Sequence, residues 1–449
     1  MRTALLTTAA GLALAAIPGT YLVRSLAAHG DKAPLSPGAA SPGHALMEKA
    51  CAECHAGERG DVQASCVRCH AASLTLENDT HAAARFDDPS RAGDLARLDA
   101  TRCATCHLEH RPHLTDSQSV SVPKDFCVVC HQDVVTERPT HAGLDSKDCA
   151  TAGCHRYHDN RSLYTDMLKA HVKDPDLLAE PHVIARRAAP EGAGAAAGEH
   201  VALATVLAGV PSADAPPAQA AAREWQASAH ARAGVACAGC HAPAASGGAW
   251  IEKPGLDVCA TCHAPERASF ASGKHGMRTA LGLPPLTTDD AKLPMQAAAR
   301  GRHLDCASCH RDHTFSLAEA AVDGCQGCHA DRHTQAYRDS PHFTAWKKEL
   351  AGAGAPGTGV SCATCHLPRS ASKESPTGVL TDHDQNRTLR PRDKMASAVC
   401  TSCHGLPFSL AALADEDLVR ANFDRAPRKI RTAFDFMKNG PQNEKRREP

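Results

Sequence analysis

The chain has 449 residues, of which 49 are Lys or Arg and 50 are Asp or Glu, so its formal net charge is −1. This balance leaves no basic excess for binding nucleic acid, and that class of partner is excluded. Aromatic residues make up only 4% of the sequence, so the two or three domains that the length suggests would have little large apolar side-chain mass for ordinary cores.

The first 28 residues have the layout of a secretory signal, because Arg2 is followed by an apolar run over residues 4–17 and then by a stretch of small residues. The uncharged stretch 4–23 is also long enough to remain as a membrane anchor. With either alternative the rest of the chain lies outside the cytoplasm, in the periplasm or beyond it. Residues 29–43, which contain several prolines and glycines, are expected to be a flexible tether.

Every one of the 22 cysteines belongs to a unit in which two cysteines are followed directly by a histidine. In ten units two residues separate the cysteines, and in the eleventh four residues do. The ten regular units are Cys51/Cys54/His55, Cys66/Cys69/His70, Cys103/Cys106/His107, Cys127/Cys130/His131, Cys237/Cys240/His241, Cys259/Cys262/His263, Cys306/Cys309/His310, Cys325/Cys328/His329, Cys362/Cys365/His366 and Cys400/Cys403/His404. The wide unit is Cys149/Cys154/His155.

This pattern is typical of covalent haem attachment. One helical turn places both sulfurs on the same side, where they can bond to the two vinyl groups of a porphyrin while the histidine reaches the iron. A single pair of cysteines would also fit a zinc site, a redox pair or a disulfide framework. Histidine is only 28 of 449 residues, yet it follows the second cysteine in all eleven units. The sequence therefore predicts eleven covalently bound haem c groups, without which the chain would be largely unfolded.

Residues 44–183 carry five units and form the first expected haem-packed module. Histidines outside the units could occupy the second axial position of each iron. A lone histidine can equally be an ordinary surface residue, but five candidates for five units favour two histidines on every iron. These candidates are His44, His81, His110, His141 and His158, with His113 and His171 as spares.

Residues 223–410 carry the other six units and form the second expected module. A histidine such as His313, three residues after the histidine of a unit, lies too close in sequence to reach the opposite face of the same haem. It is therefore expected to bind a neighbouring iron and to tie two haems together. The seven candidates for the second axial position in this module are His230, His275, His303, His313, His333, His342 and His383.

The residues between the modules, 184–222, are rich in Ala, Pro and Gly and are expected to be a linker, so His182 and His200 are not expected to be ligands. Short helices are predicted around the units and longer ones near 223–232, 316–323 and 409–422, and residues 411–449 should form a C-terminal helix and a polar tail. No stretch sustains the alternation of apolar and polar residues that is typical of a strand. The expected fold class is mostly α with extensive loops.

The second module resembles the superfamily that includes hydroxylamine oxidoreductase, octahaem tetrathionate reductase and pentahaem nitrite reductase. The resemblance rests on residues 225–230 (WQASAH), residues 337–342 (YRDSPH), the Cys-x-x-Cys-His-x-x-His run from Cys306, and the closing CTSCHG from Cys400. The first module is similar to the small cytochrome c3 and c7 electron carriers, especially in CATCHLEH and GCHRYHDN. These resemblances imply haem packing of those kinds.

Two departures from that superfamily concern its active sites. Its nitrite reductases hold the catalytic haem through a lysine in the last position of the motif, whereas all eleven units here end in histidine. Its hydroxylamine oxidoreductase cross-links the active haem to a tyrosine near the C-terminal end, and no tyrosine follows Cys403 here. No catalytic residue is therefore assigned.

The expected function is electron transfer from a membrane quinol oxidoreductase to a periplasmic or extracellular acceptor, with other periplasmic or outer-membrane cytochromes as partners and possible anchoring to the inner membrane. One alternative is a reductase of nitrite, hydroxylamine or tetrathionate with one open haem, near which Lys274, Tyr337 or Lys394 could stand. A second alternative is a subunit of a haem filament.

Overall fold

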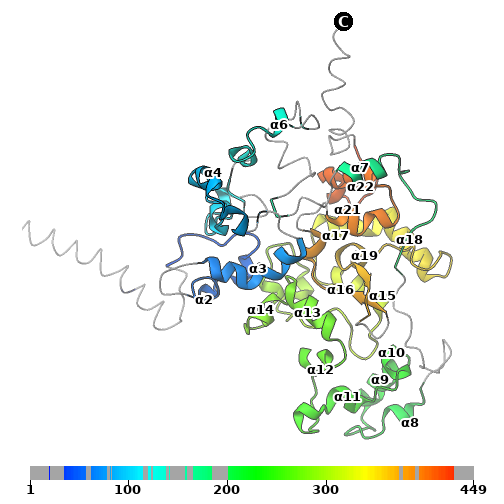
Figure 1. The fold of residues 1–449 in the computed structure, drawn as a ribbon. Coiled ribbons are helices and arrows are strands. Elements are labelled where there is room, and N and C mark those ends of the chain that lie inside the picture. The colour runs from blue at the N-terminus through cyan, green and yellow to red at the C-terminus, as the bar shows by residue number, and fades with distance from the viewer. Residues whose placement is uncertain are drawn as a thin grey trace, which may run out of the picture. The chain divides into compact units, whose positions relative to one another are not determined.

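The structure is a computed structural model, shown in Figure 1. It describes residue 20 and residues 35–56, 62–77, 81, 83–114, 120–122, 125–137, 141, 157–158, 165–184, 201–373, 378–389 and 394–428. The chain forms two compact units. Unit 1 comprises Met1–Val134, Ser146–Ala150 and Arg156–Asp159, and unit 2 comprises Val135–Asp145, Thr151–His155 and Asn160–Pro449.

Unit 1 is built from short helices joined by loops (Figure 1). The longest is α3, whose sequence QASCVRCHAASLTLE contains no Gly or Pro to interrupt it and carries one whole cysteine unit. The helices of unit 1 are η2 Ala45–Met47, α2 Cys51–Cys54, α3 Gln63–Glu77, η3 Ala83–Phe86, η4 Pro89–Arg91, α4 Ala92–Arg97, α5 Cys103–Cys106, η5 Pro112–Leu114 and η6 Phe126–Val129.

Polar side chains join the helices of unit 1. The side-chain amide of Gln63 in α3 donates to the carbonyl of Thr101, and its oxygen accepts from the backbone N–H of Cys103 in α5, at 3.2 Å and 3.0 Å. Arg68 in α3 pairs with Glu53 in α2 at 3.0 Å. Among the described residues of this unit no apolar side chain is buried, so the polypeptide alone does not supply a hydrophobic core there.

Unit 2 contains most of the helices and one small hairpin, and α6 Val134–Glu137 begins at the boundary between the units. The hairpin pairs β1 Arg369–Ala371 with β2 Val379–Thr381, antiparallel, with Ser370 opposite Leu380. The helices are α7 Thr165–His171, α8 Leu203–Val206, α9 Pro216–Trp225, α10 Ala229–Arg232, α11 Cys237–His241, η9 Ala244–Ser246, α12 Leu256–Ala260, α13 Ala264–Ser272, α14 Met277–Ala280, η10 Thr288–Asp290, η11 Ala297–Ala299, α15 Leu317–Ala320, α16 Asp323–Gln326, α17 Arg332–Ala336, η12 Tyr337–Asp339, α18 Pro341–Leu350, α19 Cys362–His366, α20 Asn386–Leu389, α21 Lys394–Ala398, η13 Cys400–Ser402, α22 Leu406–Ala414 and α23 Glu416–Arg420.

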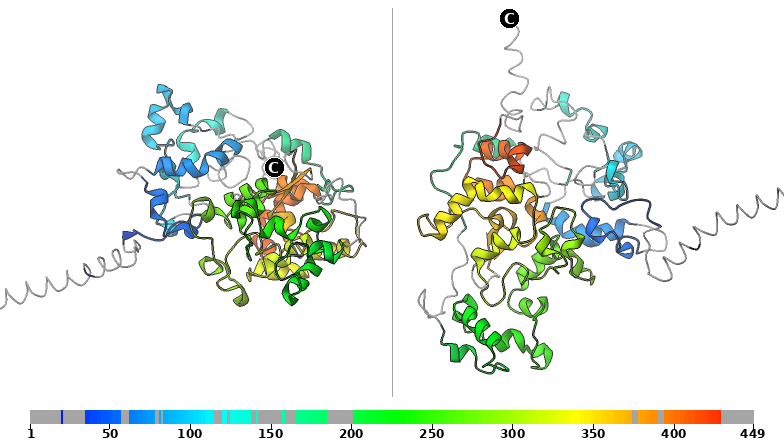
Figure 2. Two further views of the ribbon diagram at one scale, coloured as in Figure 1. Left: turned by 90° about the horizontal axis from the view of Figure 1, so that it is seen from below. Right: turned by 180° about the vertical axis from the view of Figure 1, so that it is seen from behind.

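Helix α7 lies beside α22, although more than 200 residues separate them in the sequence, and Figures 1 and 2 both show this. Leu168 of α7 is buried in one cluster with Met395, Leu406 and Leu410. The backbone N–H of His182 donates to the carbonyl of Ser402 at 2.7 Å. Residues 165–183, which the sequence analysis assigned to the first module, therefore pack within unit 2.

The second half of the expected linker is folded. Helices α8 and α9 place Val206, Ala222 and Trp225 in a buried cluster with Ala231 of α10. The alanine-rich composition concealed this packing, in which Val206 and Trp225 are the large buried side chains and partly buried residues such as Leu203 and Phe315 pack against them. The first half of the linker, including His200, lies outside the described residues.

Each of the three longer helices predicted from the sequence is divided in the structure, and capping residues explain two of the divisions. Ser228 ends the predicted helix 223–232 after α9 and caps α10, where its hydroxyl accepts from the N–H of Ala231 at 3.1 Å. Asp415 divides the predicted helix 409–422 into α22 and α23 and accepts from the N–H of Leu418 at 3.1 Å. The third predicted helix forms as α15 and part of α16.

The predicted fold class, mostly α with extensive loops, is confirmed. Part of the expected tether is packed, since Ser41 is fully buried against the loop that follows α5. The signal or anchor, apart from residue 20, and the polar tail beyond residue 428 lie outside the described residues. Within the described ranges no helix is both long and apolar enough to cross a membrane.

Candidate haem sites

The cysteine units share one backbone geometry. In seven units the N–H of the histidine donates to the carbonyl of the first cysteine at 2.8 to 3.0 Å, closing a single helical turn. These are the units that begin at Cys51, Cys103, Cys127, Cys259, Cys306, Cys325 and Cys400. The unit at Cys306 is a turn outside any helix, whereas the sequence predicted a helix around every unit. The same bond nevertheless puts its two sulfurs and its histidine on one turn.

Most of the thiols are at least partly screened from water. None of the 20 cysteines in the described ranges forms a disulfide, so no disulfide framework forms among them. Nor do the described residues include a cluster of three or more metal-binding side chains of the kind that zinc requires. Burial raises the pKa of Cys309, Cys365 and Cys400 to about 12, which keeps these thiols neutral.

The cysteines differ in their surroundings, whereas the sequence predicts one and the same role for all of them. Cys262 is exposed, as are Cys54 and Cys69, and its Sγ accepts from the hydroxyl of Thr261 at 3.9 Å. Cys328 is the opposite case, because it is only 6% exposed. A haem edge bonded to Cys262 would lie at the surface, and one bonded to Cys328 would lie in the interior. Attachment itself stays a prediction for both cysteines.

Among the described residues there are ten histidine pairs, four in unit 1 and six in unit 2. Each pair joins the histidine of one cysteine unit with a histidine from elsewhere in the chain, and the ring centroids are 5.9 to 6.4 Å apart. The pairs are His70 with His44, His55 with His110, His131 with His81, His107 with His158, His263 with His230, His241 with His313, His329 with His275, His310 with His383, His366 with His333 and His404 with His342.

The separation within these pairs fits an iron atom between two imidazoles. Two metal–nitrogen bonds of about 2 Å, together with a ring radius of about 1 Å on each side, add up to about 6 Å between centroids. Van der Waals contact would hold stacked rings closer, as in the 4.2 Å pair of His81 and Tyr157. The donor set of two thiols and two imidazoles at each site is the one that covalently bound haem requires.

The histidine that follows a cysteine unit by three residues faces a different unit. His110 pairs with His55 and not with its sequence neighbour His107, and His313 pairs with His241 and not with His310. Both residues have left-handed backbones, with φ of 62° and 63°, a conformation that residues other than glycine seldom adopt. In both pairs the ring planes are within 18° of parallel.

Backbone carbonyls orient several of the paired rings. The Nδ1–H groups of His241, His383 and His404 donate to the carbonyls of Ile251, Thr381 and Asp176 at 2.7 to 2.9 Å. With Nδ1 occupied in this way, Nε2 is the nitrogen left available to a metal. His110 is held similarly by the carbonyl of Gly38 at 2.9 Å, whereas His44 is held by the carboxylate of Glu109 at 2.7 Å.

Burial also prepares the rings for metal binding. It lowers the pKa of His275, His342 and His366 to about 4, because the protonated imidazolium is poorly solvated inside unit 2. These imidazoles are therefore neutral at pH 7 and carry the lone pair that a metal needs.

The remaining candidates are placed differently. His303 belongs to none of the ten pairs, and its side chain is exposed. The spare His171 hydrogen-bonds through Nδ1 to the Asp174 carboxylate at 2.8 Å. His141 is described, but the wide unit formed by Cys149, Cys154 and His155 lies outside the described residues.

In several places the cysteines of consecutive cysteine units are adjacent in space. The thiols of Cys66 and Cys103 are hydrogen-bonded, and burial together with this contact raises the pKa of Cys66 to about 11. In unit 2 the thiols of Cys259 and Cys306 form a similar contact, which lowers the pKa of Cys259 to about 7. The attachment points of neighbouring sites thus lie within a few ångströms of each other.

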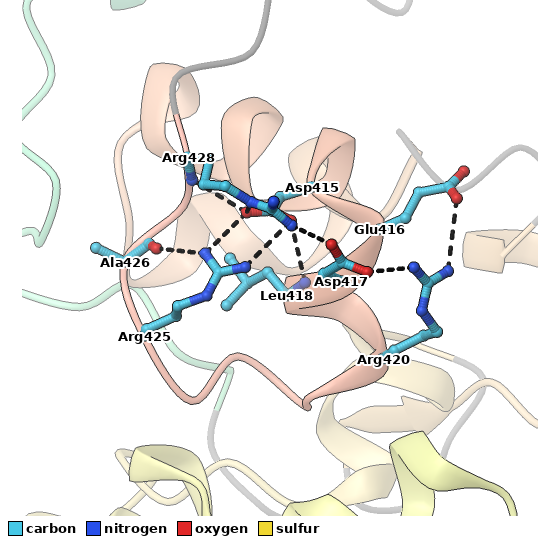
Figure 3. Close-up of polar contacts among 8 residues, drawn as sticks. All are labelled: Asp415, Glu416, Asp417, Leu418, Arg420, Arg425, Ala426 and Arg428. Atoms are coloured by element: carbon cyan, nitrogen blue, oxygen red, sulfur yellow. Dashed lines mark hydrogen bonds and ion pairs between the residues drawn. The ribbon is translucent and has the colours of Figure 1, made fainter.

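The sequence analysis missed a group of residues that supports one of the pairs. The Nδ1–H of His333 donates to the carbonyl of Val419 in α23 at 2.5 Å, and Asn422 donates to the carbonyl of His333 at 3.0 Å. Next to them Asp415, only 1% exposed, accepts hydrogen bonds from Arg425 and Arg428 (Figure 3). In the sequence, Asp415 could have been recognised as a helix cap. Its pairing with Arg425 and Arg428 could not be predicted from the spacing of these residues.

One of the side chains considered for an open haem, Tyr337, is engaged elsewhere. Tyr337 is 3% exposed, and its hydroxyl donates to the carbonyl of Val360 at 2.8 Å. Burial raises the pKa of this phenol well above its usual value. Burial also lowers the pKa of Lys394.

Residues 229–330 match the family model of cytochrome c3. This region contains the units that begin at Cys237, Cys259, Cys306 and Cys325, so the match falls in the second module, whereas the sequence analysis placed its cytochrome c3 resemblance in the first. No curated protein and no solved structure matches the chain. The cytochrome c3 family carries covalently bound c-type haem. The match and the cysteine units together support a multihaem c-type cytochrome that transfers electrons.

Proposed function

We propose that the chain carries eleven haem c groups, each with two histidine ligands, and relays electrons from a membrane quinol oxidoreductase to a periplasmic or extracellular acceptor. The observation that carries this proposal is the set of ten histidine pairs, because every described histidine of a cysteine unit has a partner at the distance an iron needs. The wide unit with His155 supplies the eleventh site, for which His141 is the candidate partner.

The bound haem supplies one-electron redox chemistry, and the side chains determine where it can occur. The two cysteines of each unit would attach the haem, and the two histidines of each pair would bind its iron. With two histidines on every iron no position would remain for a substrate, so each site would exchange electrons only. The carbonyls behind His241, His383 and His404 hold those rings in place for this role.

The order of the sites follows the order of the sequence within unit 2. The Cys259 thiol contacts Cys306, and the Cys325 thiol contacts Cys362. Consecutive haems tethered at these points would lie close enough for rapid electron transfer. The proposal therefore includes a continuous series of six haems from the unit at Cys237 to the unit at Cys400.

Location and anchoring form part of the same proposal. Haem c is attached outside the cytoplasm, so residues 1–28 would act as an export signal or as an anchor to the inner membrane. Cell fractionation, with N-terminal sequencing of the mature protein, separates the two alternatives. A mature chain that begins near residue 29 would indicate cleavage, and an intact Met1 in the membrane fraction would indicate an anchor.

Intact mass and spectroscopy test the haem content. The mass of the mature protein should correspond to eleven attached haems, and the oxidised protein should give low-spin electron paramagnetic resonance signals alone. A reductase of nitrite, hydroxylamine or tetrathionate would instead require one high-spin iron that binds carbon monoxide after reduction.

A further inference from the structure

The carboxylate of Glu109 lies directly behind one of the paired histidines. Its Oε1 is 2.7 Å from Nδ1 of His44, and His44 pairs with His70 of the unit at Cys66. The same oxygen accepts from the Ser41 hydroxyl at 2.7 Å, and Oε2 accepts from the Ser41 backbone N–H at 2.9 Å. Three donors thus fix one carboxylate against the ring.

This arrangement keeps Glu109 ionised. The carboxyl group accepts three hydrogen bonds, from the His44 ring and from the hydroxyl and backbone N–H of Ser41, and such bonds favour the charged carboxylate. Ser41 is fully buried and Glu109 is one-third exposed, so the contact is partly shielded from water. A formal negative charge therefore stands one imidazole ring away from the position of the iron.

Several other paired rings are held by neutral acceptors, although the Glu266 carboxylate lies 3.9 Å from Nδ1 of His263. Nδ1 of His241 donates to a backbone carbonyl, and so does Nδ1 of His404. A carboxylate is a stronger acceptor than a carbonyl and draws the Nδ1 proton toward itself, which makes Nε2 a stronger donor to the metal. The added negative charge favours the ferric state of the iron over the ferrous state.

We propose that Glu109 is a positioning residue that sets the reduction potential of the haem attached to Cys66 and Cys69, holding it below the potentials of haems whose histidines are backed by carbonyls. The proposal rests on the proposed function, because it takes His44 and His70 as the two ligands of that haem. This site then gives up its electron more readily than its neighbours in unit 1. Ser41, from the expected tether, holds the carboxylate in place through its two hydrogen bonds.

The test is the substitution Glu109→Gln in the full-length, haem-loaded protein. Glutamine can still accept from His44 but carries no charge. In a potentiometric titration followed by optical and paramagnetic resonance spectra, we expect the midpoint potential of one haem to shift upward. The mass should still correspond to the full number of haems. Unchanged potentials at every haem would overturn the proposal.

The matched control is Asp88→Asn, which removes one negative charge from unit 1 at an exposed position where Asp88 accepts from the N–H of Ser90. It should leave all potentials unchanged. An equal shift in this control would assign the effect to overall charge and overturn the role of Glu109. If Glu109→Gln fails to incorporate haem, Ser41→Ala provides a second test, because loss of its hydroxyl bond should raise the same potential by a smaller amount.

His44→Met distinguishes failure of this inference from failure of the proposed function. A changed spectrum at one haem in His44→Met, combined with unchanged potentials in Glu109→Gln, would retain His44 as a ligand and reject the role of Glu109. No spectral change in His44→Met would reject the ligand assignment itself, and the inference with it.

Discussion

The ring of His313 faces the ring of His241 at 6.1 Å between centroids, with the two planes 16° apart. His310, only three residues before His313, instead faces His383 at 6.3 Å. One short segment therefore contributes to two sites. Such sharing couples the two candidate sites, because any movement of this segment would disturb both of them.

Replacement of His313 by Met tests this sharing. We expect the spectrum and the potential of the haem attached to Cys237 and Cys240 to change, with the potential rising because a thioether is a weaker donor than imidazole. The haem at Cys306 and Cys309 should remain attached. The matched control is His303→Met, since His303 belongs to no pair, and it should leave every potential unaltered. A change confined to the haem at Cys306 would contradict the assignment.

The buried cluster that joins α7 to α22 should contribute strongly to the stability of unit 2. Leu406 is fully buried there, and its replacement by Ala should lower the free energy of unfolding by about 2–5 kcal/mol. Leu350→Ala, at an exposed position in the last turn of α18, should change it by less than about 0.5 kcal/mol. Denaturant unfolding of the haem-loaded protein measures both values. Equal effects of the two substitutions would show that the cluster is not a core.

Gly405 lies where no side chain fits. A Cβ there would stand 2.4 Å from the carbonyl oxygen of Pro175, far inside van der Waals contact. We expect Gly405→Ala to displace residues 174–176 and to weaken the hydrogen bond from His404 to Asp176. The spectrum of the haem at Cys400 should therefore change.

The control for this substitution is Gly255→Ala. Gly255 precedes α12 and has open space where a Cβ would be added. The Gly255→Ala substitution should have no effect on the optical spectrum. If both substitutions proved silent, the close approach of residues 174–176 to Gly405 would be wrong.

Asp415, the cap of α23, should help to hold His333 in place through the segment that contains Val419 and Asn422. Loss of the Asp415 charge weakens its contacts with Arg425 and Arg428, and this should loosen the segment that contains Val419 and Asn422 (Figure 3). Asp415→Asn should lower the melting temperature and broaden the low-spin signal of the haem bound by His333 and His366. Glu416→Gln, in an exposed pair with Arg420, should do neither. Identical behaviour of the two variants would remove the link to His333.

Much of each candidate site could be predicted from local sequence. The cysteine spacing and the following histidine are set by one helical turn, so they can be recognised without a structure. Pairing could not be predicted, because it depends on contacts between distant segments such as His44 with His70 and His310 with His383. Counting histidines supplied the candidates but did not separate the surplus His303 from the others.

Local sequence also could not show how deeply each attachment point lies. Cys262 and Cys328 occupy the same position of the same motif, yet the first is exposed and the second is buried. The difference arises from the segments packed around each unit, and these come from other parts of the chain.

The fold class followed from composition, while the packing of individual segments did not. Residues 165–183 belong to the expected first module, yet Leu168 packs among residues near 400. An alanine-rich stretch suggested a linker, yet Val206 and Trp225 are buried together. Glu109 looked like an ordinary charged residue between two histidines, and its role depends on Ser41 and His44, both more than 60 residues earlier in the chain.

The most direct test of the central claim is the electron paramagnetic resonance spectrum of the oxidised full-length protein, recorded together with the optical response of the reduced protein to carbon monoxide. Two histidines on every iron predict low-spin signals only and no carbon monoxide response. A high-spin ferric signal, with carbon monoxide binding to about one haem, would contradict the account and would point to a reductase.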